Sequence, residues 1–242
     1  MILKILIKCR LHPLVIFFLW PATGVNSQPA VIDEMSYIKT ERDLYGYYYK
    51  NMANQYKMRY FTKYAPKFLR DFGYTEAPVW FHDVVKQGLK SNYDTRVQEA
   101  IEAAGIFKMT ELADKIVALF RETPSRFTGF MFQIRDCAVG SLTRMGGDVA
   151  KKSIQELIIT YPKYLIMNPE MQTLLKATAQ YGDTSCVEAL DRLKTKAKDD
   201  LEKVKIQPDN EHKKEHEERI QGLISSIENT RNMVMNKNGG DK

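Results

Sequence analysis

The sequence contains few cysteines and histidines, and it lacks the common catalytic signatures. Of its 242 residues, 3 are Cys and 4 are His. Cys9 lies near the N-terminus, and Cys137 and Cys186 are too few for a disulfide framework, so a hydrophobic core must hold the fold. No P-loop, G-x-S-x-G elbow or G-x-G-x-x-G fingerprint occurs. We therefore predict a protein that is not an enzyme and that has neither catalytic residues nor a cofactor.

The histidines do not indicate a metal site. His212 and His216 are one helical turn apart, a spacing that can bring two imidazoles to one ion. However, "HKKEH" lacks the glutamate that directly follows the first histidine in zinc proteases, and its two lysines repel a cation. His82 lies in the apolar stretch "WFHDVV", which is typical of a histidine packed between helices. We predict no metal ligands.

The chain also lacks an apolar run of the roughly 20 residues that a membrane-spanning helix requires. A short run, 14–20, follows three basic residues and precedes the small-x-small sequence at 25–27. That order is typical of a cleaved export signal. We predict a signal peptide over residues 1–27 and a periplasmic or secreted protein whose contact with the membrane is this segment alone. A retained anchor or a buried helix is the alternative.

The excess of positive charge is local. The formal net charge is +6, yet residues 37–70 alone contain eight basic and two acidic groups. Over 91–193 the numbers nearly balance, with 12 basic and 13 acidic groups. This distribution predicts one basic surface and not a generally basic protein.

A repeated spacing surrounds three glycines, Gly105, Gly146 and Gly182. Apolar or small residues recur eight and four positions before each glycine and four, eight and eleven positions after it. These spacings each follow one face of a helix, and glycine suits the left-handed position that ends a helix. The pattern predicts a unit of helix, glycine turn and helix, with spacings of 41 and 36 residues. Gly73 marks a weaker fourth unit.

The stretches "IRDCAVGSLTRMGGDVAKKSIQELI" (134–158) and "LLKATAQYGDTSCVEALDRL" (174–193) resemble HEAT-like repeats of the short kind found in PBS-lyase proteins. The shared signature is an apolar helix that ends in hydrophobic-Gly-Asp, followed by a small residue and a leucine on the next helix. "DTRVQEAIEAAGIFKMTELADKIVALF" (94–120) matches it more loosely. The resemblance covers roughly 94–195, and it implies a helical architecture without implying an activity.

These patterns predict an all-α fold, a short right-handed α-solenoid of HEAT-like helix pairs with an N-terminal helical cap and a C-terminal amphipathic helix. The expected organisation is a Tyr-rich helical segment at 28–92, a repeat domain at 93–205, and a charged helix and tail at 206–242.

The stretch "YGYYYKNMANQYKMRYFTKY" (45–64) holds seven of the 13 tyrosines. On one continuous helix, a single face would carry Tyr45, Tyr49, Met52, Tyr56, Tyr60 and Tyr64. Such a stripe indicates the packed face of a long cap helix. Tyr47 and Tyr48 point elsewhere, so they are our predicted partner contacts in this stretch, because aromatic rings interleaved with Lys and Arg suit ligand binding.

The C-terminal region carries a narrow apolar stripe: Ile220, Leu223, Ile224, Ile227 and Val234. It is shorter than three heptads. We expect this helix to dock back on the chain; pairing with another chain is the alternative, and the oligomeric state stays open.

We expect a non-enzymatic interaction module that holds a protein or peptide on the concave surface of the solenoid. The expected contacts at its rim lie beside the repeat glycines: Arg135, Arg144, Lys151 and Lys152. The alternative is a protein whose aromatic, basic segment at 45–64 recognises a glycan or another component of the cell envelope. Nucleic acid is disfavoured as a partner because the protein is expected to be exported.

Overall fold

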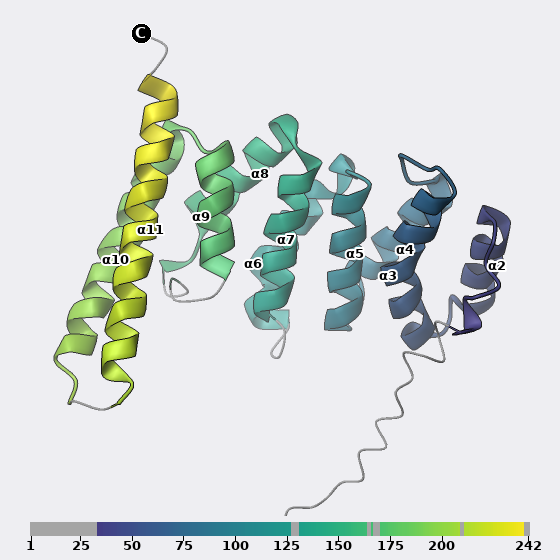
Figure 1. The fold of residues 1–242 in the computed structure, drawn as a ribbon, viewed down its shortest axis with the longest axis horizontal. Helices are drawn as coiled ribbons and strands as arrows, with labels where there is room; N and C mark the ends of the chain where they lie inside the picture. Colours follow the sequence, from purple (N-terminus) through teal and green to yellow (C-terminus); the bar gives the residue numbers. More distant parts are fainter. Residues whose placement is uncertain (1–32, 127–130, 164–165, 167–169, 209–210, 240–242) are drawn as a thin grey trace, which may run out of the picture. The chain divides into compact units, whose positions relative to one another are not determined.

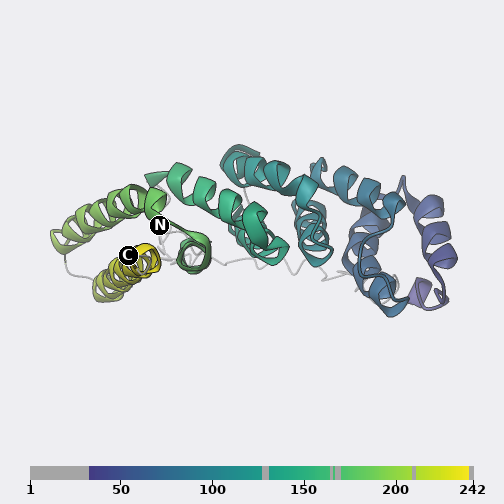
Figure 2. The same cartoon turned by 90° about the horizontal axis from the view of Figure 1, so that it is seen from above.

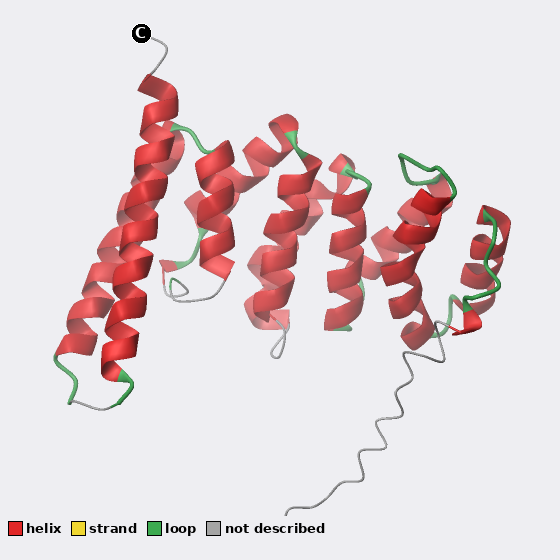
Figure 3. Cartoon of the chain, in the orientation of Figure 1, coloured by secondary structure: helices red, strands yellow, loops and turns green. Residues whose placement is uncertain are grey.

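A computed structural model describes residues 33–126, 131–163, 166, 170–208 and 211–239. Within these residues the regular structure is helical throughout and contains no strand, so the predicted all-α fold class is confirmed (Figure 3). The predicted signal peptide lies outside the described residues. The elements, in chain order, are α2 (Glu41–Asn51), α3 (Gln55–Asp71), α4 (Val79–Leu89), α5 (Asp94–Ile106), η1 (Thr110–Leu112), α6 (Ala113–Arg126), α7 (Met131–Met145), α8 (Gly147–Thr160), α9 (Glu170–Tyr181), η3 (Thr184–Cys186), α10 (Val187–Lys205) and α11 (Lys213–Gly239).

The chain divides into two compact units, Met1–Tyr37 and Ile38–Lys242. Of the first unit the structure describes residues 33–37. The second unit contains all the elements named above, including those of the predicted Tyr-rich segment, repeat domain and C-terminal helix.

Helices of the second unit pack in two layers (Figures 1 and 2). In one layer α3 contacts α5, α5 contacts α7, α7 contacts α9, and α9 contacts α11. In the other layer α6 contacts α8, and α8 contacts α10. Consecutive helices also pack across the layers, as α4 does with α5 and α6 with α7. Each helix from α5 to α11 therefore packs against a helix next to it in the sequence and against a helix two positions away in the helix order.

The predicted repeat positions form the core between these layers. Their side chains are buried at Val97, Ile101, Met109, Ala113, Ile116, Ala138, Leu142, Ala150, Ile154, Leu157, Leu174, Thr178, Cys186, Leu190 and Leu193. The helical period of the sequence thus identified the inward faces correctly.

The three repeat glycines are not equivalent, so that part of the prediction is wrong. Gly146 lies between α7 and α8 with a φ of +74°, a backbone conformation that favours glycine. Gly182 lies between α9 and η3. Gly105, in contrast, is inside the last turn of α5, and the left-handed residue after that helix is Lys108, with a φ of 50°. The weaker glycine, Gly73, does end α3 at a φ of +90°.

The C-terminal helix docks back on the chain, as expected. In α11 the side chains of Ile220, Leu223, Ile227 and Val234 are buried. Arg231 Nε lies 2.8 Å from Asp191 of α10, and Lys194 Nζ of α10 lies 2.7 Å from Glu228. Within the described part of the chain, none of the helices combines the length and the apolar composition that crossing a bilayer requires.

Candidate functional site: a tyrosine and arginine pocket

The tyrosine-rich stretch forms two helices and not one. Helix α2 ends at Asn51 and α3 begins at Gln55. Asn54 separates them as the N-cap of α3, where its side-chain oxygen accepts a hydrogen bond from the Lys57 backbone N–H at 3.1 Å. This break resets the helical phase, so the predicted stripe over 45–64 does not run continuously.

Tyr47 and Tyr48 are buried, so their predicted role as partner contacts is wrong. Their exposed fractions are 3% and 7%. Tyr47 stacks on Phe61 with ring centroids 5.9 Å apart, and Tyr48 stacks on Trp80 at the same separation. The physical reason is that Leu44, Tyr47 and Tyr48 share the inward face of the short helix α2.

The exposed rings are those that were expected to be packed. Tyr45, Tyr49, Met52 and Tyr56 all have exposed side chains, and 68% of Tyr49 is accessible to solvent. From the predicted stripe, Tyr60 is buried and Tyr64 is half-buried. Solvent-facing tyrosines are therefore concentrated on α2 and at the start of α3.

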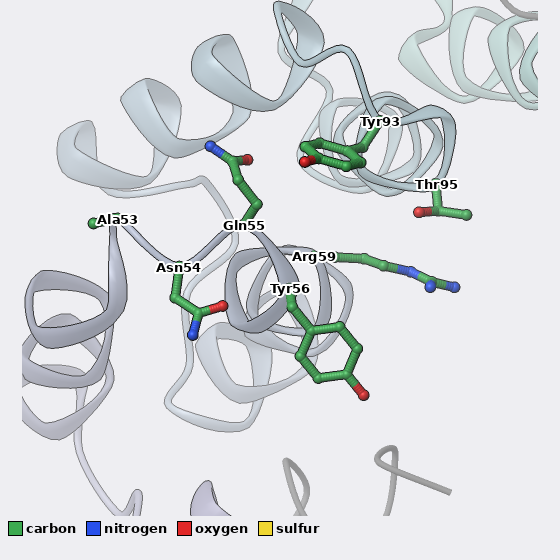
Figure 4. Close-up of a pocket in the computed structure, with 7 residues that line it drawn as sticks. All are labelled: Ala53, Asn54, Gln55, Tyr56, Arg59, Tyr93 and Thr95. Atoms are coloured by element: carbon green, nitrogen blue, oxygen red, sulfur yellow. The ribbon is translucent and has the colours of Figure 1, made fainter. Parts of the chain in front are cut away.

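A pocket of about 660 Å³ opens beside these tyrosines, where α3 and α5 begin (Figure 4). Its described lining consists of Ala53, Asn54, Gln55, Tyr56, Arg59, Tyr93 and Thr95. In the view of Figure 4, Arg59 extends between Tyr93 and Thr95 on one side and Tyr56 on the other. The volume falls in the range of pockets that hold small ligands.

Two helix starts position the rings of this pocket. Tyr56 is the second residue of α3, two positions after the Asn54 cap. Tyr93 occupies the N-cap position of α5. Its backbone N–H donates a hydrogen bond to the Ser91 hydroxyl, with 3.1 Å between nitrogen and oxygen. Its ring projects outward and is 60% exposed. Short connections between packed helices thus hold both rings at the mouth of the pocket.

The pocket is electropositive. Arg59 is half-buried, and its guanidinium carbon lies 5.3 Å from the centre of the Tyr60 ring. Behind the wall, Arg96 is 5% exposed and donates a hydrogen bond to the side-chain oxygen of Gln55. Burial lowers the pKa of Arg96, because the charged guanidinium is poorly solvated.

The carboxyl group of Glu99 lies on α5, about one helical turn after Arg96. Burial raises the pKa of Glu99 to about 7, although Lys63 and Arg59 of α3 favour its charged form and Glu102 opposes it. Glu102 also accepts a hydrogen bond from the Cys137 thiol at 3.2 Å, and burial is the main cause that raises the pKa of Cys137 to about 12. A thiol with such a pKa is a poor nucleophile near neutral pH.

The prediction that Arg135 is a rim contact is also wrong. Its side chain is fully buried, with Nη1 3.0 Å from Glu170 Oε1 and Nε donating to the Phe120 carbonyl at 3.1 Å. Tyr161 donates its hydroxyl proton to the same Glu170 oxygen at 3.2 Å. Arg135 thus connects its own helix, α7, with α6 and α9 inside the core, and it cannot contact a partner.

The other predicted rim residues are exposed but lie away from the pocket, on α7 and α8. Arg144 donates to the Ser141 hydroxyl at 3.1 Å. Lys151 lies 3.5 Å from Asp183, and Lys152 lies 3.8 Å from Asp114. They stay predictions, because the structure does not bring them together with the tyrosines.

His82 is not simply packed between helices. Its Nδ1 lies 2.7 Å from Glu111 Oε1, and the imidazole is partly exposed. His212 and His216 line a separate hollow near the start of α11. Among the described residues, no group of three or more His, Cys, Asp or Glu side chains is arranged to hold a metal ion.

Sequence reasoning missed Arg59, Tyr93 and Arg96 as site residues. A signal for the site was present in "NMANQ" (51–55), because asparagine is a preferred N-cap and interrupts a helical pattern. Treating Asn54 as a helix start would have divided the predicted stripe between two helices. The approach of Tyr93 and Thr95 to α3 depends on tertiary packing and has no local signal.

Comparison with family models found no match for this chain. Searches of the curated proteins and of the solved structures found no match either.

Proposed function

We propose that this protein is an exported, non-enzymatic binding module, in which HEAT-like helix pairs present a pocket to a protein or peptide partner. The observation that carries this proposal is the pocket at the starts of α3 and α5, in which the exposed Tyr56 and Tyr93 flank Arg59. Its described lining contains no carboxylate, imidazole or thiol that would serve as a general acid, a general base or a nucleophile. The lining thus favours recognition over reaction.

The residue types in the pocket are those that dominate binding at protein interfaces. Tyrosine and arginine are enriched among the side chains whose truncation weakens a complex most. A tyrosine ring supplies a large contact area and loses little conformational entropy, because it has only two side-chain torsions. Asn54, Gln55 and Thr95 add hydrogen-bonding groups beside the rings.

The helical scaffold supports this use. Helix α3 packs on α5, and both helices pack on α4, so the pocket lies between elements that are fixed by the core. A binding site held by packed helices keeps its geometry without a ligand, which reduces the entropic cost of association.

Recognition of a glycan is the second candidate. The exposed rings of Tyr45, Tyr49 and Tyr56 favour it, because aromatic faces next to amide side chains suit a ligand that is apolar on one face and polar at its edges. The exported location expected from the sequence agrees with either ligand.

Selection from a random peptide display library on the purified protein tests the proposal. We expect peptides that bind saturably, and we expect the double substitution Tyr56→Ala and Tyr93→Ala to weaken them about 30-fold, which corresponds to ~2 kcal/mol. Tyr49→Ala is the matched control, because Tyr49 is exposed but does not line the pocket. Failure to select any saturable peptide, or equal loss in the control, would refute the proposed site.

A further inference from the structure

The pocket has an unbalanced positive charge. Arg59 and Arg96 each have a buried Nε that makes no hydrogen bond to a described residue. The hydrogen bond that Arg96 does donate goes to Gln55, an uncharged side chain. Within the described part of the chain, neither guanidinium forms an ion pair with a carboxylate.

This arrangement differs from the other deeply buried arginine. Arg135 also has a buried nitrogen, Nη2, that makes no hydrogen bond to a described residue, but its guanidinium is paired with Glu170 at 3.0 Å and donates to a backbone carbonyl. A buried charge without a counterion is costly, since it has lost its water and gained no opposite charge in return. The core around Arg135 supplies that opposite charge from within the chain, and the wall around Arg96 does not.

Two carboxyl groups of α5, those of Glu99 and Asp94, do not form an ion pair with the pocket arginines. Glu99 interacts with Arg59, but at neutral pH its carboxyl is partly protonated because burial raises its pKa to about 7. Asp94 lies in the first turn of α5 but is not part of the lining. The first turn of α3 contains no acid, so its backbone N–H groups add positive potential at the mouth.

From these observations we infer that the pocket selects a peptide through a carboxylate group, which Arg59 binds at the mouth while the rings of Tyr56 and Tyr93 enclose the adjoining atoms. Arg96, held behind Gln55, contributes positive potential and keeps that amide oriented. Arginine suits this role because its planar guanidinium can donate two parallel hydrogen bonds to one carboxylate. The carboxylate can belong to an Asp or Glu side chain or to the C-terminus of the partner. This inference rests on the proposed function and names the chemistry of its ligand.

Titration of the ¹⁵N-labelled protein with short defined peptides tests the inference. The probes are Ac-Gly-Glu-Gly-NH₂, its Gln counterpart, and Ac-Gly-Gly-Gly with a free C-terminal carboxylate. We expect the Nε–H resonance of Arg59 to shift saturably with at least one of the two carboxylate peptides and not with the Gln peptide. The peptide that shifts it distinguishes the side-chain source from the terminal source.

The substitution Arg59→Gln should weaken the carboxylate peptide at least about tenfold, the usual loss when a charge-assisted hydrogen bond is removed. Lys67→Gln removes the same charge from an exposed position further along α3 and should leave binding unchanged. Equal shifts with the Glu and Gln peptides would overturn the carboxylate inference while leaving a peptide-binding pocket. Absence of a saturable shift with both carboxylate peptides would overturn the inference, whereas the proposed function fails only if no displayed peptide binds saturably.

Discussion

Arg135 and Glu170 show at the level of single residues how this chain accommodates a buried charge. The two side chains are fully buried, 35 positions apart in the sequence, and they connect α7 with α9. Phe120 of α6 adds a carbonyl acceptor and a ring whose centre lies 5.1 Å from the Arg135 guanidinium carbon. The sequence analysis predicted Arg135 as a rim contact because it is a polar residue near a repeat glycine. Arginine is rarely buried, and Glu170, the partner that makes its burial tolerable, is 35 positions away in the sequence.

We predict that Arg135→Met lowers the free energy of unfolding by about 3–5 kcal/mol, because Glu170 is left as an unpaired buried carboxylate. Adding Glu170→Gln to that variant should restore more than about half of the loss, as the remaining charge is removed. Chemical denaturation measures both values. Arg144→Met, at an exposed position on the same helix, serves as the control, and a comparable loss there would contradict this account.

Glu99 gives a pH dependence whose sign follows from its raised pKa. Its pKa is about 7 in the folded protein and 4.5 in the unfolded reference, so between these values the folded state binds more protons. The free energy of unfolding should therefore fall as the pH rises through this window and become level above about pH 7. We predict that Glu99→Gln removes this decline and stabilises the protein by about 1 kcal/mol at pH 8, a modest effect because solvent screens the partly exposed group.

Denaturation curves recorded from about pH 4.5 to pH 8 check that prediction. Glu218→Gln, at an exposed position of α11, should leave the decline in place. A wild-type protein whose stability rises steadily over the same range would show that burial does not raise the pKa of Glu99.

At the level of elements, glycine has two different uses in this fold. Gly146 and Gly73 adopt positive φ values and end helices. Gly105 is required for packing instead, since a Cβ at that position would lie 2.7 Å from the Cα of Ser141 on α7. The sequence could not distinguish these uses, because a glycine at the end of a helical pattern fits a turn and a close helix contact equally well.

We predict that Gly105→Ala destabilises the protein by about 1–3 kcal/mol, because α5 and α7 must move apart to admit the methyl group. Gly140→Ala is the matched control: Gly140 lies inside α7, and a Cβ there meets no atom within 4 Å. That change should stabilise the protein by up to about 1 kcal/mol through helix propensity. Thermal unfolding compares the two, and stabilisation by both would contradict a tight contact between α5 and α7.

At the level of the whole molecule, the helical content and the inward faces of 94–193 could be predicted, because each long periodic segment buries the residues that its period selects. The exposed face of 45–64 could not be read in the same way, since Asn54 divides the stretch and shifts the phase of each half. The pocket was not predicted because Tyr93 and Thr95 approach Arg59 from a different helix.

This molecule has a buried core and, separate from it, an exposed aromatic and basic site. That separation supports the proposed binding role. Arg135 and the repeat positions stabilise the helical layers, whereas Arg59, Tyr56 and Tyr93 remain accessible at one place. The proposed site and the core thus consist of different residues, and we expect variants of the site to fold normally.

Mapping of backbone amide shifts while a display-selected peptide is added tests the central claim most directly. We expect the largest changes within 53–59 and 93–96, the segments that contain the residues lining the pocket. Changes confined to α8 and α10, with the pocket amides unmoved at saturation, would contradict it.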